Sequence, residues 1–259
     1  MTGFQRELQR QVIALQIRLY ACQARLQARS DDEALHDLRI ALRRLRSLLR
    51  PLRRERLCAA LELAAGALGE VSGPLRDLEV LAAELEERGL PHSARLRRAH
   101  LADGYARLLE GLPLRRLLIL LDDWPEDQRQ ALRSGESQAR GRAVARYMRK
   151  QGKQLAKALR DPAHDRHRLR LLIKRLRYCS ETWPQRADLG AGVLKALRNA
   201  QSALGDWHDH WQWLQRLPSE PDLEPCADAW HGRLQQAEVA ADQALQALLE
   251  YFPEAPAQS

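Results

Sequence analysis

Residues 34–46, ALHDLRIALRRLR, and residues 165–177, DRHRLRLLIKRLR, are two versions of one segment. When His36 is aligned with His167, every matched pair is 131 positions apart. From the histidine onward, each cation of the first segment is aligned with a cation of the second. We refer to them as the first and second basic segments. Agreement in residue type at a fixed spacing is the signature of an internal repeat.

A second match follows each basic segment. Gly73 and Asp77 in GPLRDLEVL correspond to Gly205 and Asp209 in GDWHDHWQWL, and both pairs are 132 positions apart. Two matches at nearly the same spacing predict that the chain is a duplication of about half its length.

Composition limits the class of protein. With 259 residues, of which 45% are hydrophobic, the chain can bury a sizeable core, and its net charge of +8 favours an anionic partner. No run of about 18 apolar residues and no apolar leader is present, so we expect neither membrane insertion nor secretion. Four cysteines without a CxxC pair indicate neither a zinc knuckle nor a disulfide framework, which fits a reducing cytoplasm: Cys22, Cys58, Cys179 and Cys226.

Helix formers dominate the chain. Leu, Ala, Arg, Glu and Gln are abundant and strand-building residues are scarce, which predicts an all-α protein with about four helices in each half. The weakly patterned stretch 122–141 is the expected junction between halves of about 1–130 and 131–259. The expected helix breaks are Ser30–Asp32, Gly73-Pro74, Gly89–Pro91, Gly111–Pro113, Trp124-Pro125, Asp161-Pro162, Pro184 and Pro218–Pro225.

Caps are expected in front of both basic segments. Ser30 and Asp31 are suited to cap the helix of the first segment. Asp161 followed by Pro162 is typical of a cap with proline at the first helical position, in front of the second.

Helical periodicity places the cations of each basic segment in a row beside a row of leucines. At about 100° per residue, the first row covers an arc of about 80°. It comprises His36, Arg39, Arg43, Arg46 and Arg50, and the adjacent leucine row comprises Leu35, Leu38, Leu42, Leu45 and Leu49. The second segment repeats the basic row with His167, Arg170, Lys174 and Arg177. The helix before it gathers further cations on one face: Arg142, Arg146, Arg149, Lys153, Lys157 and Arg160.

A row of cations is often an ordinary solvated helix face, but such a face usually mixes charges of both signs. Residues 39–54 contain no acidic residue at all. Because like charges crowded on one helix are destabilising, we interpret the rows as an anion-binding surface rather than as solvated faces.

The doubled pattern of apolar-His-x-x-Arg-x-x-x-Arg/Lys-Arg-x-Arg, each followed by a Gly…Asp helix, resembles the conserved histidine α-helical domain (CHAD) family, over essentially the whole chain, 1–259. The resemblance implies two four-helix bundles related by pseudo-twofold symmetry, with a central basic channel that binds inorganic polyphosphate. It further implies a cytoplasmic protein associated with polyphosphate granules. Members often accompany a triphosphate-tunnel domain with an ExExK strand; this chain has none, which favours a stand-alone binding module.

The candidate polyphosphate-binding residues combine the matched motif positions with the cations of the preceding helix. Arg44 and Arg175 match the motif, although helical geometry turns them away from the rows. The full set is His36, Arg39, Arg43, Arg44, Arg46, Arg50, Arg142, Arg146, Lys150, Lys153, Lys157, His167, Arg170, Lys174, Arg175 and Arg177.

These residue types suit a flexible polyanion without bases. Arg donates two N–H groups to phosphate oxygens, and Lys supplies a mobile charge. Because a protonated histidine adds a charge and a donor, we expect binding to tighten as the pH falls through about 6.5 if His36 and His167 take part.

Two other functions remain open at this point. Nucleic acid needs the same phosphate contacts, but aromatic residues are only 5% of the chain, and no helix-turn-helix or zinc finger is present, so we rank it second. An enzyme is not expected, because no phosphate-cradling loop and no carboxylate cluster occurs. We therefore expect no catalytic residue, cofactor or metal.

The stretch GDWHDHW is the best place for a metal, through Asp206, His208, Asp209 and His210. His208 and His210 are two positions apart and therefore face different sides of a helix, so a structural role is favoured. Asp77 and Asp209 are expected to orient neighbouring arginines. The tryptophans of the second half are expected to fill its core or cap its ends rather than to bind a ligand: Trp183, Trp207, Trp211, Trp213 and Trp230.

Overall fold

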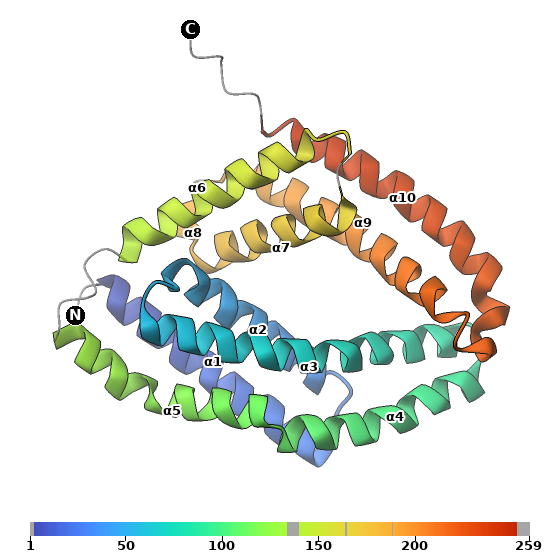
Figure 1. Cartoon of the computed structure of the whole chain (residues 1–259), viewed down its shortest axis with the longest axis horizontal. Helices are drawn as coiled ribbons and strands as arrows, with labels where there is room; N and C mark the ends of the chain where they lie inside the picture. The colour runs from blue at the N-terminus through green and yellow to red at the C-terminus, as the bar shows by residue number, and fades with distance from the viewer. Residues whose placement is uncertain (1–2, 134–139, 164, 188, 253–259) are drawn as a thin grey trace, which may run out of the picture. The chain divides into compact units, whose positions relative to one another are not determined.

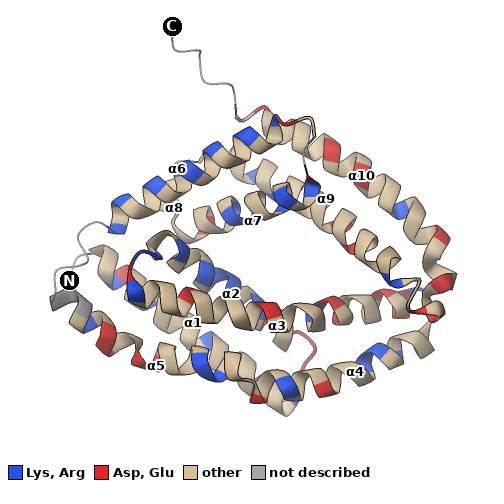
Figure 2. Ribbon diagram, viewed as in Figure 1, with Lys and Arg blue, Asp and Glu red and all other residues tan. Residues whose placement is uncertain are grey.

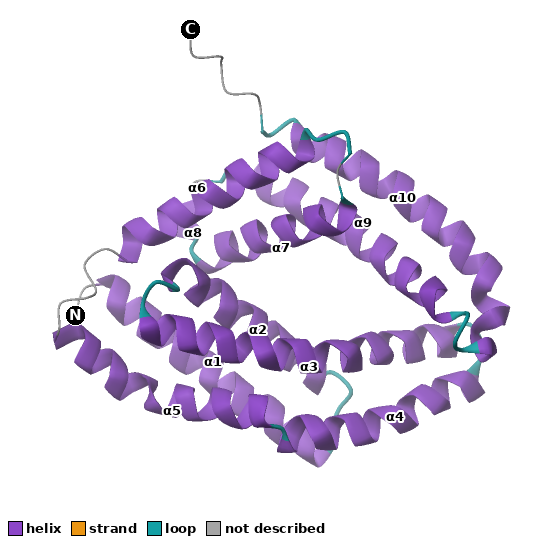
Figure 3. Cartoon of the chain, viewed as in Figure 1, coloured by secondary structure: helices purple, strands orange, loops and turns teal. Residues whose placement is uncertain are grey.

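The computed structural model describes residues 3–133, 140–163, 165–187 and 189–252. In this part of the chain all regular structure is helical and no strand occurs (Figure 3). The predicted all-α class is confirmed. The internal duplication and the central channel stay predictions.

Contacts within the chain divide it into two compact units, Met1–Ala145 and Arg146–Ser259. Figure 1 labels the helices. Unit 1 contains α1 (Gly3–Ala28), α2 (Ala34–Leu49), the 3-10 helix η1 (Arg50–Leu52), α3 (Arg56–Glu87), α4 (Pro91–Glu110) and α5 (Leu112–Arg133). Helix α6 (Arg140–Leu159) crosses the division. Unit 2 continues with α7 (Arg166–Thr182), α8 (Pro184–Ala187), α9 (Ala191–Arg216), the 3-10 helix η2 (Pro221–Cys226) and α10 (Ala227–Leu249).

The described part of unit 1 has five α-helices before α6, where about four were expected. Two predicted breaks are wrong, because Pro74 lies inside α3 and Pro125 inside α5. A proline inside a helix removes one backbone hydrogen bond. Helix α3 packs against α2, α4 and α5, and burial of residues such as Leu68 and Leu81 offsets that loss.

The expected junction, residues 122–141, is largely helical in its described part. Helix α5 continues to Arg133, residues 134–139 lie outside the described residues, and α6 begins at Arg140. The Arg140 side chain is buried and donates from Nε to the Glu55 carboxylate at the start of α3, at 2.8 and 2.9 Å. A buried ion pair thus anchors the beginning of α6.

The caps differ from expectation. Asp165, not Asp161, caps α7, because its Oδ1 accepts the backbone N–H of His167 at 2.8 Å. Glu33 precedes α2 without a side-chain cap hydrogen bond. Asp31 instead orders the preceding turn by accepting the Glu33 N–H at 3.0 Å.

The leucine row of the first basic segment lies in the core as predicted, since all five of its members are buried: Leu35, Leu38, Leu42, Leu45 and Leu49. In unit 2 the apolar faces of α6, α7, α9 and α10 meet in one core, which includes Leu155, Ile173, Leu197 and Leu245. Each basic segment is therefore fixed along one side, and its basic row borders the core instead of entering it.

Candidate functional site

The N-terminal part of the basic row in unit 1 lies against α3. His36 and Arg43 are partly buried. Arg39 Nη1 donates to the carbonyl oxygen of Gly69 at 3.0 Å and to Ser72 Oγ at 3.1 Å. Burial lowers the pKa of Arg39, whereas the nearby Asp77 carboxylate opposes that shift by stabilising its charged form. The role expected of Asp77, to orient a neighbouring arginine, stays a prediction.

The C-terminal part of the same row is partly compensated in charge by a residue that the sequence did not single out. Glu62 of α3 accepts from Arg50 Nη2 at 2.8 Å and from Arg46 Nε at 3.3 Å. The absence of acidic residues within residues 39–54 is therefore offset by the neighbouring helix. One carboxylate shared by two arginines compensates half of their positive charge, which weakens the sequence argument for these two members of the predicted site.

Glycines of α3 make room for these guanidinium groups. A Cβ added at Gly66 would lie 3.5 Å from Arg46 Cζ, and one at Gly73 would lie 3.5 Å from Arg39 Nη1. A side chain larger than alanine at either glycine would therefore displace an arginine. The glycine spacing was the signal in the sequence that α3 packs against the basic row.

In unit 2 the row of α7 lies against α9. His167 is exposed, and Arg170 and Lys174 are partly buried. Arg177 donates from Nε to Gln201 Oε1 at 2.8 Å, pairs with Glu181 one turn later, and lies 4.2 Å from the Tyr178 ring centroid. Gln201 accepts from Arg177 Nε as Glu62 accepts from Arg46 Nε in unit 1, but Gln201 is neutral.

His208 of α9 belongs to this site, although the sequence assigned it a structural role. Its ring centroid lies 5.4 Å from that of His167. Burial, followed by the charges of Arg170, His167 and Lys174, lowers the pKa of His208 to about 4. His208 is therefore neutral at pH 7 and lies close enough to Arg170 and Lys174 for their charges to act on it. Its Nδ1 is buried and has no hydrogen-bond partner among the described residues.

Helix α6 carries the most exposed cations of the predicted set. Its sequence has no acidic residue, and Figure 2 shows Lys and Arg recurring along its length. We call the following residues the α6 basic face: Arg142, Arg146, Arg149, Lys150, Lys153 and Lys157. They are exposed, and in the described structure none of them makes a hydrogen bond or ion pair with another side chain. Arg160 differs, because it donates to the backbone oxygens of Ala156 and Phe252.

The two predicted residues outside the rows are exposed as helical geometry requires. Arg44 and Arg175 make no ion pair within the described ranges. Arg25 of α1 is held by Asp31 and Asp37, at 2.7 and 2.6 Å. The strongest accumulation of unpaired cations therefore lies on α6.

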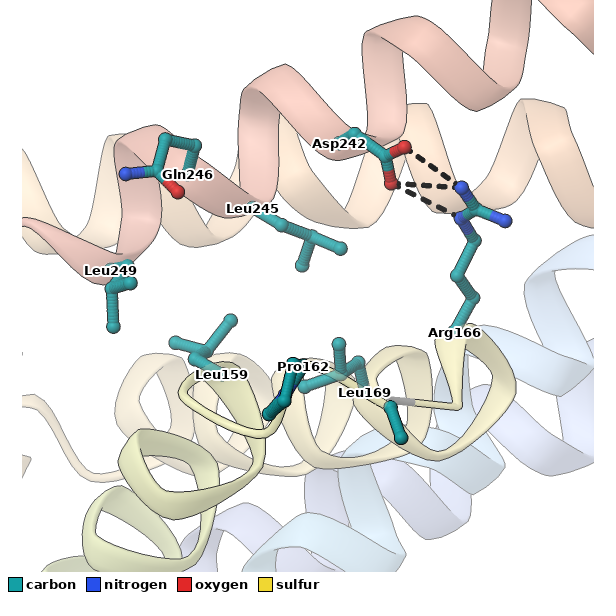
Figure 4. A pocket seen from close by; sticks show the side chains of 9 residues that line it. Leu159, Pro162, Arg166, Leu169, Asp242, Leu245, Gln246 and Leu249 are labelled. Carbon is teal, nitrogen blue, oxygen red and sulfur yellow. Dashed lines mark hydrogen bonds and ion pairs between the residues drawn. The ribbon is translucent and has the colours of Figure 1, made fainter.

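A pocket of about 490 Å³ opens beside α7 (Figure 4). Its walls are mainly aliphatic, with Leu159, Leu169 and Leu245 among them, and Arg166 at its edge donates to both carboxylate oxygens of Asp242. An aliphatic pocket with a neutralised arginine is unsuited to a polyanion.

The stretch proposed for a metal does not converge on one point. His208 faces α7, whereas His210 Nδ1 lies 2.7 Å from the backbone oxygen of Asp206 and its ring packs against Trp213. Within the described residues no three His, Cys, Asp or Glu side chains come together as metal ligands.

The comparisons with known proteins agree with this fold. The CHAD domain model matches residues 11–218, which is well over half of the chain. The chain belongs to the CHAD domain family. A crystal structure of the CHAD domain from the plant Ricinus communis is similar to this CHAD protein, with a TM-score of 0.70 and 23% sequence identity. The match covers 95% of this chain and 91% of the plant chain, and at that identity it shows the shared fold.

No curated protein sequence matches this CHAD protein. In addition, none of the helices that the structure describes has the length and apolar character needed to cross a membrane.

Proposed function

We propose that this CHAD protein binds inorganic polyphosphate and acts as a binding module rather than as an enzyme. The α6 basic face carries the proposal, because its cations are exposed and have no protein counter-charge in the described structure. Such a face is destabilising by itself and becomes favourable when an anion neutralises it.

The shape of the face suits a chain of phosphates. Residues 146–157 of α6 line a shallow groove, and this stretch of helix is about 16 Å long. A linear polyanion without bases can follow such a row and contact successive cations. Hydrogen bonds that involve charged groups contribute about 1.5–3 kcal/mol each, and exposure to water reduces this amount.

The basic segments add a second set of contacts. In unit 2, His167, Arg170 and Lys174 gather beside His208. In unit 1, His36 and Arg43 lie on α2, on the N-terminal side of the two arginines that Glu62 contacts. We include a cytoplasmic location and association with polyphosphate granules in this proposal, on the strength of the family resemblance.

The test is a competition experiment with fluorescent long-chain polyphosphate. The variant Lys150/Lys153/Lys157→Ala removes three exposed cations of α6. We expect it to weaken binding at least about tenfold and, by analogy with nucleic acids, to reduce the slope of log affinity against log salt by about two to three. RNA and duplex DNA at equal phosphate concentration should displace polyphosphate poorly.

The matched control is Lys195/Arg198/Arg233→Ala, which removes three exposed cations of α9 and α10 in the same unit. It should retain the affinity of the unmodified protein. Equal loss in both variants would mean that only net charge matters, and equal competition by RNA would make the face a general polyanion surface. Either result would contradict specific polyphosphate binding.

A further inference from the structure

One tryptophan of unit 2 is not explained by the core. Trp183, Trp213 and Trp230 are buried as expected, but Trp207 is only partly buried and Trp211 is 43% exposed. A partly exposed tryptophan that lies within an aromatic cluster offers an apolar ring face to a ligand.

Trp211 is the outer member of a stack on α9. Its ring lies 6.2 Å from the His208 ring with an interplanar angle of 16°, and 6.4 Å from the Trp207 ring with an angle of 23°. Arg166 Cζ lies 5.9 Å from the Trp207 ring centroid. The neighbouring rings hold Trp211 in place and leave part of its surface open.

His208 joins this stack to the cations of α7. The same ring that stacks on Trp211 lies 5.4 Å from His167, and the charges of Arg170 and Lys174 act on it. An aromatic surface and a phosphate-binding surface therefore meet in unit 2. Unit 1 has no counterpart, because Leu75, Arg76 and Glu79 stand at the positions 132 residues before Trp207, His208 and Trp211.

We propose that Trp211, supported by His208 and Trp207, is a stacking surface for a nucleobase, and that unit 2 binds a nucleoside triphosphate whose phosphates lie on His167, Arg170 and Lys174. The phosphate half of this site rests on the proposed function, and the nucleobase half goes beyond it.

A mononucleotide fits better than single-stranded RNA. Proteins that bind single strands offer successive aromatic rings along a groove. In the described part of unit 2 the other exposed aromatic ring is Tyr251, which lies against Gly192. One open ring beside a group of cations accommodates one base and its phosphates.

The experiment compares ATP with inorganic tripolyphosphate by calorimetric titration of the full-length protein at one ionic strength. Tripolyphosphate carries the larger charge, so any preference for ATP comes from the nucleoside. We expect ATP to bind about tenfold more tightly, as one base–aromatic stack provides. Trp211→Ala should remove this preference without changing tripolyphosphate affinity, and Trp211→Phe should retain most of it.

Tyr251→Ala is the matched control, since Tyr251 is 47% exposed and lies outside the stack; it should bind ATP like the unmodified protein. Equal affinity for ATP and tripolyphosphate, unaffected by Trp211→Ala, would overturn the nucleobase site and leave the proposed function intact. If the unmodified protein bound neither ATP nor tripolyphosphate, both the nucleobase site and the proposed function would be overturned. An oligoadenylate that binds far more tightly than ATP through Trp211 would assign the stack to single-stranded RNA and also overturn the proposal.

Discussion

The two basic segments have nearly the same sequence, yet their cations meet different partners. In unit 1, Glu62 of α3 partly compensates the charges of Arg46 and Arg50, because its single carboxylate contacts both. In unit 2, Arg177 forms an ion pair with Glu181 of its own helix and donates to the neutral Gln201 of α9, and the neutral His208 lies near Arg170 and Lys174. The counter-charge therefore comes from the neighbouring helix in unit 1, but from the same helix in unit 2.

Even the residues that align between α3 and α9 differ in their surroundings. A Cβ on Gly73 would lie 3.5 Å from Arg39, whereas a Cβ on Gly205 would meet nothing within 4 Å. The sequence match between these two glycines thus does not extend to their contacts. The following predictions test how far the two units differ.

The largest effect is expected at His208, which has no histidine counterpart in unit 1. Its pKa of about 4 in the folded protein is below the ordinary value near 6.5, so between these pH values the unfolded chain binds more protons. The free energy of unfolding should therefore keep its full value above pH 6.5 and fall by up to about 3 kcal/mol as the pH drops towards 4. Urea unfolding at pH 4.5 and 7.5 measures this difference, and His208→Gln should reduce it; an unchanged difference in the variant would exclude His208 as its source.

A smaller effect is expected from Arg39 of unit 1. Arg39→Met removes the hydrogen bonds to the Gly69 carbonyl and to Ser72 Oγ, so we expect the free energy of unfolding to fall by about 2 kcal/mol. The control Lys153→Met changes an exposed residue of the α6 basic face and should leave stability within about 0.5 kcal/mol. If urea unfolded both variants with equal free energy, the hydrogen bonds of Arg39 to α3 would not contribute to the stability of the fold.

The smallest effect is expected from releasing the neutralised arginines. Glu62→Gln frees Arg46 and Arg50 from their counter-charge and should tighten polyphosphate binding about two- to fivefold, at a stability cost of at most about 1 kcal/mol. Glu7→Gln, which breaks the exposed pair with Arg10, is the control for the change in net charge. The same gain in affinity in both variants would mean that Glu62 has no specific effect on the site.

Several features of the fold were predictable because they depend on local sequence. The leucine row of α2 is buried as the helical period requires, and the exposure of Arg44 and Arg175 follows from the same geometry. The caps and two helix breaks were not predictable in this way. Pro74 and Pro125 lie within helices because packing across the unit outweighs the local loss of a hydrogen bond.

The candidate site was predictable to a different degree on each helix. The α6 basic face is exposed as its sequence indicated, since one helix is enough to define it. The row of α2 was only partly predictable, because Glu62 lies far enough along the chain to be outside any local pattern. His208 and Trp211 were assigned to structural roles, and their positions depend on how α9 packs against α7.

The sequence by itself determined that this protein is helical, where its cations form rows, and which residues border the core. These properties repeat with the helical period and need no information from distant residues. Only the tertiary structure decided which cations are neutralised, which histidine lies among them and which tryptophan remains exposed. Each of those outcomes requires two helices that are remote in sequence to pack together, and a side chain's charge and solvation depend on the neighbours it meets there.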